Sequence, residues 1–231
     1  MRSFEVMATA DRLPRLREIA AVVFDMDGVL VDSEPLHFRA ANRVLARHGQ
    51  AITEAEYVRF IGLGEQATWA AWRERYALAP PVEDLVAAHT TARRAEIAAG
   101  IEPIGEATAL ARQLASAAVP IAIASSSAPA VIDALLDALG VGALFPVRVS
   151  GEDADVARSK PAPDVYLAAA RRLGIAPAAC VAIEDSEPGV AAATAAGMLC
   201  VAVPTRWTAH QDFRAADVVL ASLRYFPLLV F

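Results

Sequence analysis

The sequence predicts an α/β fold, in which a parallel sheet is covered by helices on both faces and an all-helical segment is inserted after the first strand. Three observations predict it. From residue 105 onward, short apolar runs alternate with segments of helical periodicity, which is typical of βα units that build a parallel sheet. These runs are continuously apolar, as expected for strands buried on both faces. Between 33 and 104 no such run occurs, so this segment is expected to contain helices alone.

The first strand is predicted at 19–24, where β-branched and apolar residues dominate. The insert then opens with a helix that begins after Ser33, a residue type that caps helices. Pro35 is tolerated in the first turn of this helix, and Gly49 follows its end at about 47. Further helices of the insert are predicted from Thr53, at 65–77 and at 82–99.

The second half of the chain alternates regularly. Strands are predicted at 119–124, 146–150, 179–183, 199–203 and 217–220. Helices are predicted at 105–117, 128–139, 162–173 and 187–196. We therefore divide the chain into an α/β core, residues 1–32 plus 105–231, and a helical domain, residues 33–104. Because the insert follows the end of the first strand, we expect it to lie over the site and to act as a lid.

The composition excludes several classes of protein. Of the 231 residues, 56% are hydrophobic, which suffices for a sizeable core and is far from a disordered composition. The formal net charge of −6 argues against a nucleic-acid-binding or membrane-surface protein. No apolar stretch reaches the roughly 18 residues that a transmembrane helix needs. We expect a cytoplasmic monomer that binds neither nucleic acid nor membrane.

The sequence is less informative about the two ends of the chain and the two cysteines. The first 15 or so residues are expected to form a weakly anchored extension, and the apolar end at 225–231 to pack on the core. Cys180 and Cys200 both fall within predicted strands. They are expected to be small buried hydrophobes rather than a disulfide.

The most informative segment is the end of the first strand. Asp25 and Asp27 follow the apolar run directly, and Gly28 comes next. Ligands and chemistry gather at the carboxyl ends of strands in open parallel sheets. Two carboxylates beneath an apolar strand are costly unless a cation or a reaction needs them. The alternative is a turn in which Asp and Gly serve geometry alone.

Three later segments place polar residues at the ends of further strands or at the start of a helix. Ser125 and Ser126 precede a helix start, where hydroxyls and free backbone N–H groups make an anion site, although helix capping explains them equally well. Lys160 stands directly before Pro161, which restricts the lysine to an extended backbone. Its ammonium group would neutralise a phosphate and a carboxylate beside it, and the alternative is a solvated lysine on the surface.

The last of these segments is acidic. Glu184 and Asp185 follow the strand predicted at 179–183, and helix capping by Asp185 or Ser186 is the competing account. Because histidine and cysteine are absent nearby, oxygen ligands of this kind favour Mg²⁺ over zinc.

Together these residues resemble the four motifs of the haloacid dehalogenase-like (HAD) superfamily, in its branch of phosphatases and β-phosphoglucomutases. The resemblance spans roughly residues 19–220, and the helical insert stands where the family's helical C1 cap stands. It implies a Rossmann-like parallel-sheet core. The four segments that carry the resemblance are 25–33, Ser125, 160–164 and 184–186.

The resemblance implies a Mg²⁺-dependent phosphatase that acts on a small phosphorylated metabolite, such as a sugar phosphate. Asp25 would attack phosphorus and form an aspartyl-phosphate, and Asp27 would act as general acid and then general base. Ser125, Ser126 and Lys160 would hold the phosphoryl oxygens. Mg²⁺ would be bound by Asp25, Asp185, Glu184 and the backbone carbonyl of Asp27.

The substrate stays open, and so do two other functions. His37 matches a histidine of β-phosphoglucomutase that would contact substrate, although a structural role on its helix face is equally open. The resemblance to β-phosphoglucomutase implies an arginine shortly after a cap glycine for a second phosphate, and Glu65 stands in that stretch here. The alternatives for this role are other arginines of the cap: Arg73, Arg75, Arg93 and Arg94. The phosphatase is therefore preferred over the mutase. A non-catalytic binding protein of this fold is disfavoured because Asp25, Asp27 and Asp185 are all present.

Overall fold

The computed structural model describes residues 7–8, 19–61 and 63–226 of the chain. The chain divides into two compact units. The core unit runs to Val31 and resumes at Pro103, and the helical unit comprises Asp32–Glu102. The boundaries expected from the sequence lay at 33 and 104.

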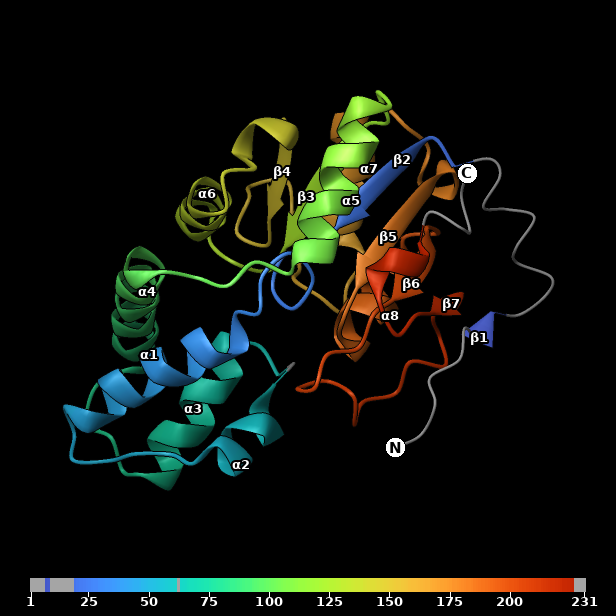
Figure 1. The fold of residues 1–231 in the computed structure, drawn as a ribbon. Helices are drawn as coiled ribbons and strands as arrows, with labels where there is room; N and C mark the ends of the chain where they lie inside the picture. Colours follow the sequence, from blue (N-terminus) through green and yellow to red (C-terminus); the bar gives the residue numbers. More distant parts are fainter. Residues whose placement is uncertain (1–6, 9–18, 62, 227–231) are drawn as a thin grey trace. The chain divides into compact units, whose positions relative to one another are not determined.

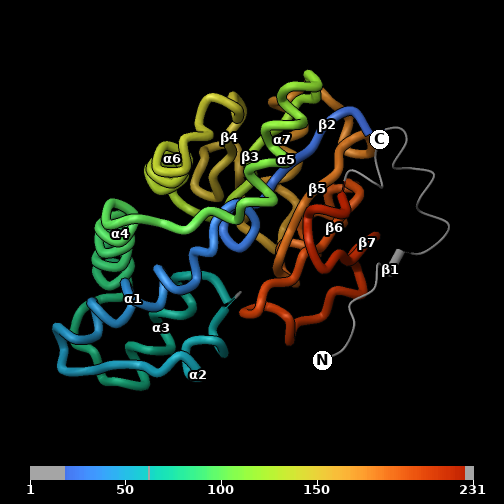
Figure 2. Tube along the Cα trace, in the orientation of Figure 1, coloured from blue at the N-terminus to red at the C-terminus, as the bar shows by residue number. Residues whose placement is uncertain are grey.

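The core unit is built on one sheet whose strands follow the order β1-β7-β6-β5-β2-β3-β4. The six strands predicted from the sequence are present: β2 (Ala21–Phe24), β3 (Ile121–Ser125), β4 (Val147–Ser150), β5 (Cys180–Glu184), β6 (Leu199–Ala202) and β7 (Val218–Val219). All neighbours among these six pair in parallel. Strand β2 therefore lies between β3 and β5, although both come more than ninety residues later in the chain (Figure 2).

A seventh strand, β1 (Met7–Ala8), was not expected. It pairs antiparallel with β7 at one edge of the sheet, with Met7 opposite Val219. The predicted weak anchoring of the N-terminus is therefore wrong for these two residues, because backbone pairing at a sheet edge does not require an apolar sequence pattern. Residues 1–6 and 9–18 lie outside the described part of the chain.

Among the described residues of the core unit, four α-helices accompany the sheet: α5 (Gly105–Ser116), α6 (Pro129–Ala138), α7 (Asp164–Leu173) and α8 (Glu187–Ala195) (Figure 1). Alternate strand residues such as Val23, Ala122 and Ala182 form one apolar cluster with side chains of α7 and α8. Small residues, alanine above all, dominate this cluster. The strands β2, β3 and β5 are buried along their whole length, as their continuous apolar sequences predicted.

The helical unit contains α1 (Glu34–Ala46), α2 (Glu54–Tyr57), α3 (Glu65–Arg75) and α4 (Val82–Ala99), with a short 3₁₀ turn at Val58–Phe60. It has its own apolar core around Trp69 and Trp72, which are 1% and 2% exposed and meet edge to face. Thr53 caps α2 through reciprocal hydrogen bonds with Glu56, as its sequence position predicted.

Ser33 precedes α1 as predicted, but the expectation that it caps this helix is wrong. Its backbone is helical rather than extended, so its side chain is not directed at the amides of the first turn. The buried hydroxyl finds no hydrogen-bond partner among the described residues.

The two ends of the helical insert meet in the core unit. Val31 and Pro103 form an antiparallel bridge, and the Ile104 amide donates to the carbonyl of Leu30 over 2.9 Å. The chain therefore leaves and re-enters the core at a single place.

The apolar C-terminus is described only in part. Phe226 is fully buried and Tyr225 is 38% exposed, while residues 227–231 lie outside the described part of the chain. Among the described helices, none combines the length and the apolar character that crossing a membrane requires.

Candidate active site

The carboxyl ends of three adjacent strands carry the predicted site. Phe24 of β2 stands in register with Ile123 of β3 and Ile183 of β5. The residues that follow these three positions therefore emerge together at one edge of the sheet. Asp25 is fixed there by its amide, which donates to the carbonyl of Ile183 over 2.9 Å.

Lys160 is the cation of this edge. Its Nζ lies 2.5 Å from Asp25 Oδ1 and 2.7 Å from Glu184 Oε1, and it donates to the carbonyl of Ala124 over 2.9 Å. The side chain is 8% exposed. The alternative of a solvated surface lysine is excluded by these contacts. The peptide bond between Lys160 and Pro161 is cis.

Glu184 is fully buried and anchors the lysine. Its Oε1 accepts short hydrogen bonds from Lys160 and from the hydroxyl of Tyr166, at 2.7 and 2.6 Å. Its Oε2 accepts longer bonds of 3.2 to 3.4 Å from the amides of Asp185 and Ser186 and from the Ser186 hydroxyl. Ser186 also caps α8, so this carboxylate lies at the N-terminus of that helix.

Tyr166 is a site residue that was not predicted from the sequence. It is fully buried, and its ring centroid lies 5.0 Å from Lys160 Nζ. In the sequence it belongs to the apolar stripe of α7, six positions after Lys160, and such a position predicts a core residue. Only the hydroxyl, which phenylalanine lacks, distinguishes Tyr166 from an ordinary apolar core residue.

Two glycines make room for the acidic side chains. A β-carbon on Gly28 would lie 2.1 Å from Asp185 Oδ2, and one on Gly189 would lie 2.0 Å from the carboxylate carbon of Glu184. Gly28 has a φ of +80°, which a side chain would strain in addition. The glycine of the first motif and the glycine of α8 are therefore required by close approach, not only by turn geometry.

Burial and like charge act together on Asp25. Desolvation raises the pKa of its carboxyl to about 8, and Lys160 opposes the rise while Glu184 and Asp27 add to it. Desolvation lowers the pKa of Lys160, but the two carboxylates outweigh it and hold this pKa above its usual value. The lysine therefore stays charged, and the acidic group around it carries an excess of negative charge.

That excess is the local signature of a cation site. Asp25, Glu184 and Asp185 are all buried, and their ligand atoms lie within 4.8 Å of one another. Oxygen donors alone suit Mg²⁺. Glu184 Oε1 accepts the shorter bonds of this carboxylate, from Lys160 and Tyr166, and its Oε2 accepts the longer ones. The donor set of this edge thus fits the predicted ion.

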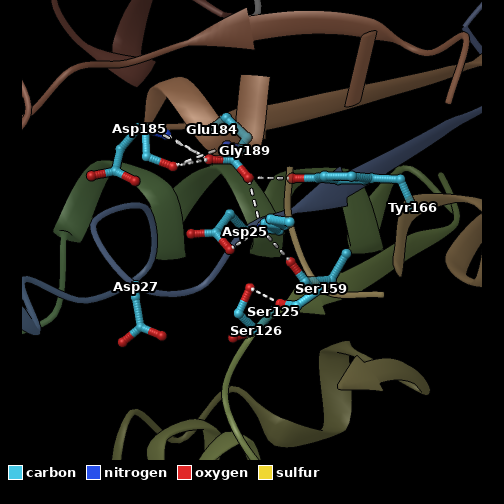
Figure 3. A network of polar contacts seen from close by, with 12 residues as sticks. Asp25, Asp27, Ser125, Ser126, Ser159, Tyr166, Glu184, Asp185 and Gly189 are labelled. Atoms are coloured by element: carbon cyan, nitrogen blue, oxygen red, sulfur yellow. Dashed lines mark hydrogen bonds and ion pairs between the residues drawn. The ribbon is translucent and has the colours of Figure 1, made fainter. Parts of the chain in front are cut away.

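Asp27 lies apart from this acidic group. Figure 3 shows its carboxylate directed away from Asp25, Glu184 and Asp185. Its Oδ2 accepts a hydrogen bond of 2.9 Å from the hydroxyl of Ser127. The structure therefore separates the two aspartates of the first motif into different environments, although they are two residues apart.

The serines after β3 each have a different partner. Ser125 is 1% exposed, and its Oγ accepts from the amide of Ser127 over 3.1 Å. Ser126 is exposed, and its Oγ accepts from the Ser159 hydroxyl over 3.0 Å (Figure 3). Ser127 and Ser159 were not singled out from the sequence, because nothing in a run of serines indicates which hydroxyl turns toward which partner.

His37 belongs to the helical unit and is not part of the group described above. It lies on α1, and its ring centroid is 5.8 Å from that of His89. His89 in turn bonds Glu65 over 2.5 Å. A role of His37 toward substrate remains a prediction.

Comparison with known proteins gives a consistent result. Residues 19–197 match the family described as haloacid dehalogenase-like hydrolase. The chain is 37% identical to the protein CbbY of Rhodobacter capsulatus, over 87% of this chain and 92% of that protein. It is 34% identical to hexitol phosphatase B of Escherichia coli K12, over 90% of this chain and 94% of that enzyme.

A solved structure agrees with the fold. CbbY from Rhodobacter sphaeroides, crystallised as a variant in complex with xylulose-(1,5)bisphosphate, superposes with a TM-score of 0.81. The two are 32% identical, and the match covers 89% of this chain and 95% of that one. From the family match, these relatives and the four motifs at the strand ends, we conclude that the chain is an enzyme of the haloacid dehalogenase-like hydrolase family.

Proposed function

We propose that the enzyme is a Mg²⁺-dependent phosphatase that hydrolyses a small sugar phosphate or related polyol phosphate through an aspartyl-phosphate on Asp25. The observation that carries the proposal is the position of Asp25, which is buried at a strand end in contact with Lys160 and grouped with Glu184 and Asp185. Relatives whose names include a hexitol phosphatase, and a relative crystallised with a sugar bisphosphate, support the substrate class.

Asp25 is suited to the role of nucleophile. Its backbone is fixed by β5, and one carboxylate oxygen is held by Lys160, so the orientation of the other oxygen is set before substrate binds. Asp25, Glu184, Asp185 and the backbone carbonyl of Asp27 would hold the Mg²⁺ ion. When bound, the ion offsets the repulsion between an anionic carboxylate and an anionic phosphate.

The remaining phosphoryl oxygens need donors. Ser125, Ser126 and Lys160 provide hydroxyl, amide and ammonium groups around the end of β3. The carboxylate of Asp27 is separated from the acidic group that would bind the cation, and it is therefore suited to proton transfer. It would protonate the leaving oxygen and then take a proton from the water that attacks the aspartyl-phosphate.

The test is the release of inorganic phosphate from a panel of sugar phosphates, polyol phosphates and nucleotides, with Mg²⁺ and with chelator. We expect rapid Mg²⁺-dependent release from one or a few sugar or polyol phosphates, and none from the Asp25→Asn variant. Release that persists in chelator or in Asp25→Asn would overturn the mechanism. Release from nucleotides alone would overturn the substrate class.

The mutase remains the alternative if no panel member releases phosphate. The sequence predicts that Glu65 stands where the mutase pattern has an arginine, which favours the phosphatase. The carboxylate of Glu65 is hydrogen-bonded to His89 within the helical unit. Interconversion of hexose phosphates, primed by a hexose bisphosphate, is the assay that would support the mutase against the phosphatase. Absence of both activities would overturn the phosphatase and the mutase alike.

A further inference from the structure

The hydroxyl of Ser127 donates to a carboxylate oxygen of Asp27 over 2.9 Å, across a sequence separation of one hundred residues. We propose that Ser127 is a positioning residue that aims the Asp27 carboxylate at the leaving oxygen of the substrate. The inference rests on the proposed function, in which Asp27 transfers the proton to that oxygen. It adds a residue of the serine run to the acid–base machinery, apart from the phosphoryl-binding role of its two neighbours.

The backbone of Ser127 is fixed on both sides. Its amide donates to the hydroxyl of Ser125 over 3.1 Å, and its carbonyl accepts from the hydroxyl of Ser150 over 2.8 Å. Ser125 and Ser150 are each 1% exposed, and Ser127 itself is 8% exposed. Because the backbone of Ser127 is held on both sides, the position of its hydroxyl is fixed. The hydroxyl can therefore determine the orientation of the Asp27 carboxylate.

The backbone of Asp27 is fixed as well. The Gly28 amide donates to the carbonyl of Val31 over 2.8 Å, and the carbonyl of Met26 accepts from the amide of Leu30 over 2.9 Å. This tight turn leaves side-chain rotation as the freedom that remains to Asp27. The hydrogen bond from Ser127 therefore acts on the rotamer of this side chain.

The selected direction suits an acid. In an in-line displacement the leaving oxygen lies on the side of phosphorus opposite the nucleophile. An acid that protonates it must therefore stand away from Asp25, and Figure 3 shows the Asp27 carboxylate directed away from Asp25. The bond from Ser127 also keeps this carboxylate out of the acidic group formed by Asp25, Glu184 and Asp185.

The test compares two substrates that differ in their need for an acid. An alkyl phosphate, such as the best sugar or polyol phosphate of the panel, has a poor leaving group, whereas p-nitrophenyl phosphate has a good one. Substrate consumption is followed in a single turnover with enzyme in excess, which isolates phosphoryl transfer to Asp25. We expect Ser127→Ala to slow the alkyl phosphate by about tenfold or more and to leave p-nitrophenyl phosphate nearly unchanged. Ser127→Thr retains the hydroxyl and should restore most of the rate.

A double-variant cycle decides whether Ser127 acts through Asp27. In an Asp27→Asn background the acid is already lost, so adding Ser127→Ala should change the rate by less than about twofold. Equal slowing of both substrates, full slowing in the Asp27→Asn background, or no effect of Ser127→Ala would each overturn the inference. If the wild-type enzyme consumes neither substrate, the proposed function fails first. Circular dichroism of each variant establishes that the fold is retained.

Discussion

Gly189 lies directly against the carboxylate of Glu184. A β-carbon at Gly189 would stand 2.0 Å from the carboxylate carbon and from both carboxylate oxygens, far inside van der Waals contact. The N-terminal turn of α8 and the end of β5 can therefore approach each other only while residue 189 has no side chain. Four experiments follow from this and other contacts of the core unit.

We expect Gly189→Ala to displace Glu184 and, with it, Lys160. Overpacking should lower the free energy of unfolding by about 1–3 kcal/mol, and misplacement of the lysine should reduce kcat by about 100-fold. Gly105→Ala is the matched control, since no atom lies within 4 Å of the β-carbon that it would introduce. Chemical unfolding and steady-state kinetics measure both effects. Wild-type kinetics in Gly189→Ala would contradict the close approach of α8 to Glu184.

The pKa of Asp25 makes the stability of the metal-free enzyme depend on pH. Because burial raises this pKa from 3.8 to about 8, the folded protein retains a proton that the unfolded chain has released. The associated stability is complete below pH 3.8 and is lost as pH rises to about 8. The loss should amount to a few kcal/mol, at roughly 1.36 kcal/mol for each pKa unit in the window.

Thermal unfolding in chelator between pH 5 and about 9 measures this dependence. Asp25→Asn should flatten the profile, whereas the same change at the exposed Asp137 should leave it as in the wild type. Saturating Mg²⁺ should also flatten it, since a bound cation keeps the carboxylates ionised. An unchanged slope in Asp25→Asn would show that another group carries the proton.

Tyr166→Phe removes one hydroxyl from the support of Glu184 and keeps the aromatic ring near Lys160. Desolvation and the charge of Glu184 raise the pKa of this phenol well above its usual value, so it remains a donor throughout the accessible pH range. Loss of a hydrogen bond to a buried charge should cost about 1.5–3 kcal/mol of unfolding free energy. Tyr225→Phe, at a residue that is 38% exposed, should cost less than about 0.5 kcal/mol. Equal costs in the two variants would refute the bond to Glu184.

Both thiols should be inert in the folded enzyme. Burial raises the pKa of Cys180 to about 11, and burial with the nearby charge of Glu184 raises that of Cys200 well above its usual value. At about pH 8 the thiolate fraction is therefore negligible, and a disulfide reagent such as DTNB should titrate neither cysteine until urea is added. Rapid reaction of either thiol in the native protein would contradict this environment.

The sequence was most informative where chemistry coincides with the ends of strands. Asp25, Ser125 and Glu184 were predicted to lie together because carboxyl ends of parallel strands share one edge of a sheet, and the register of β2, β3 and β5 places them there. Lys160 was identified by its place before Pro161 within a motif, although its direct contacts with Asp25 and Glu184 are visible only in the structure.

Other features have no signal in the sequence. Ser127 stands third in a run of identical residues, and only the turn after β3 decides which hydroxyl reaches Asp27. Tyr166 has the spacing of an ordinary core residue. Ser33 has the residue type of a helix cap but a backbone conformation that does not use it. Residue type and spacing predict which elements form, whereas side-chain direction depends on tertiary contacts.

The bridge between Val31 and Pro103 has a consequence for how this enzyme can change. The helical insert is a long loop of the core unit that begins and ends at neighbouring backbone positions. The entropic cost of closing such a loop grows only slowly with its length. Inserts of different size therefore lower the stability of the sheet by nearly the same amount. The bridge is thus a natural splice point, where evolution or an engineer can exchange one module for another without touching the strands that carry the chemistry.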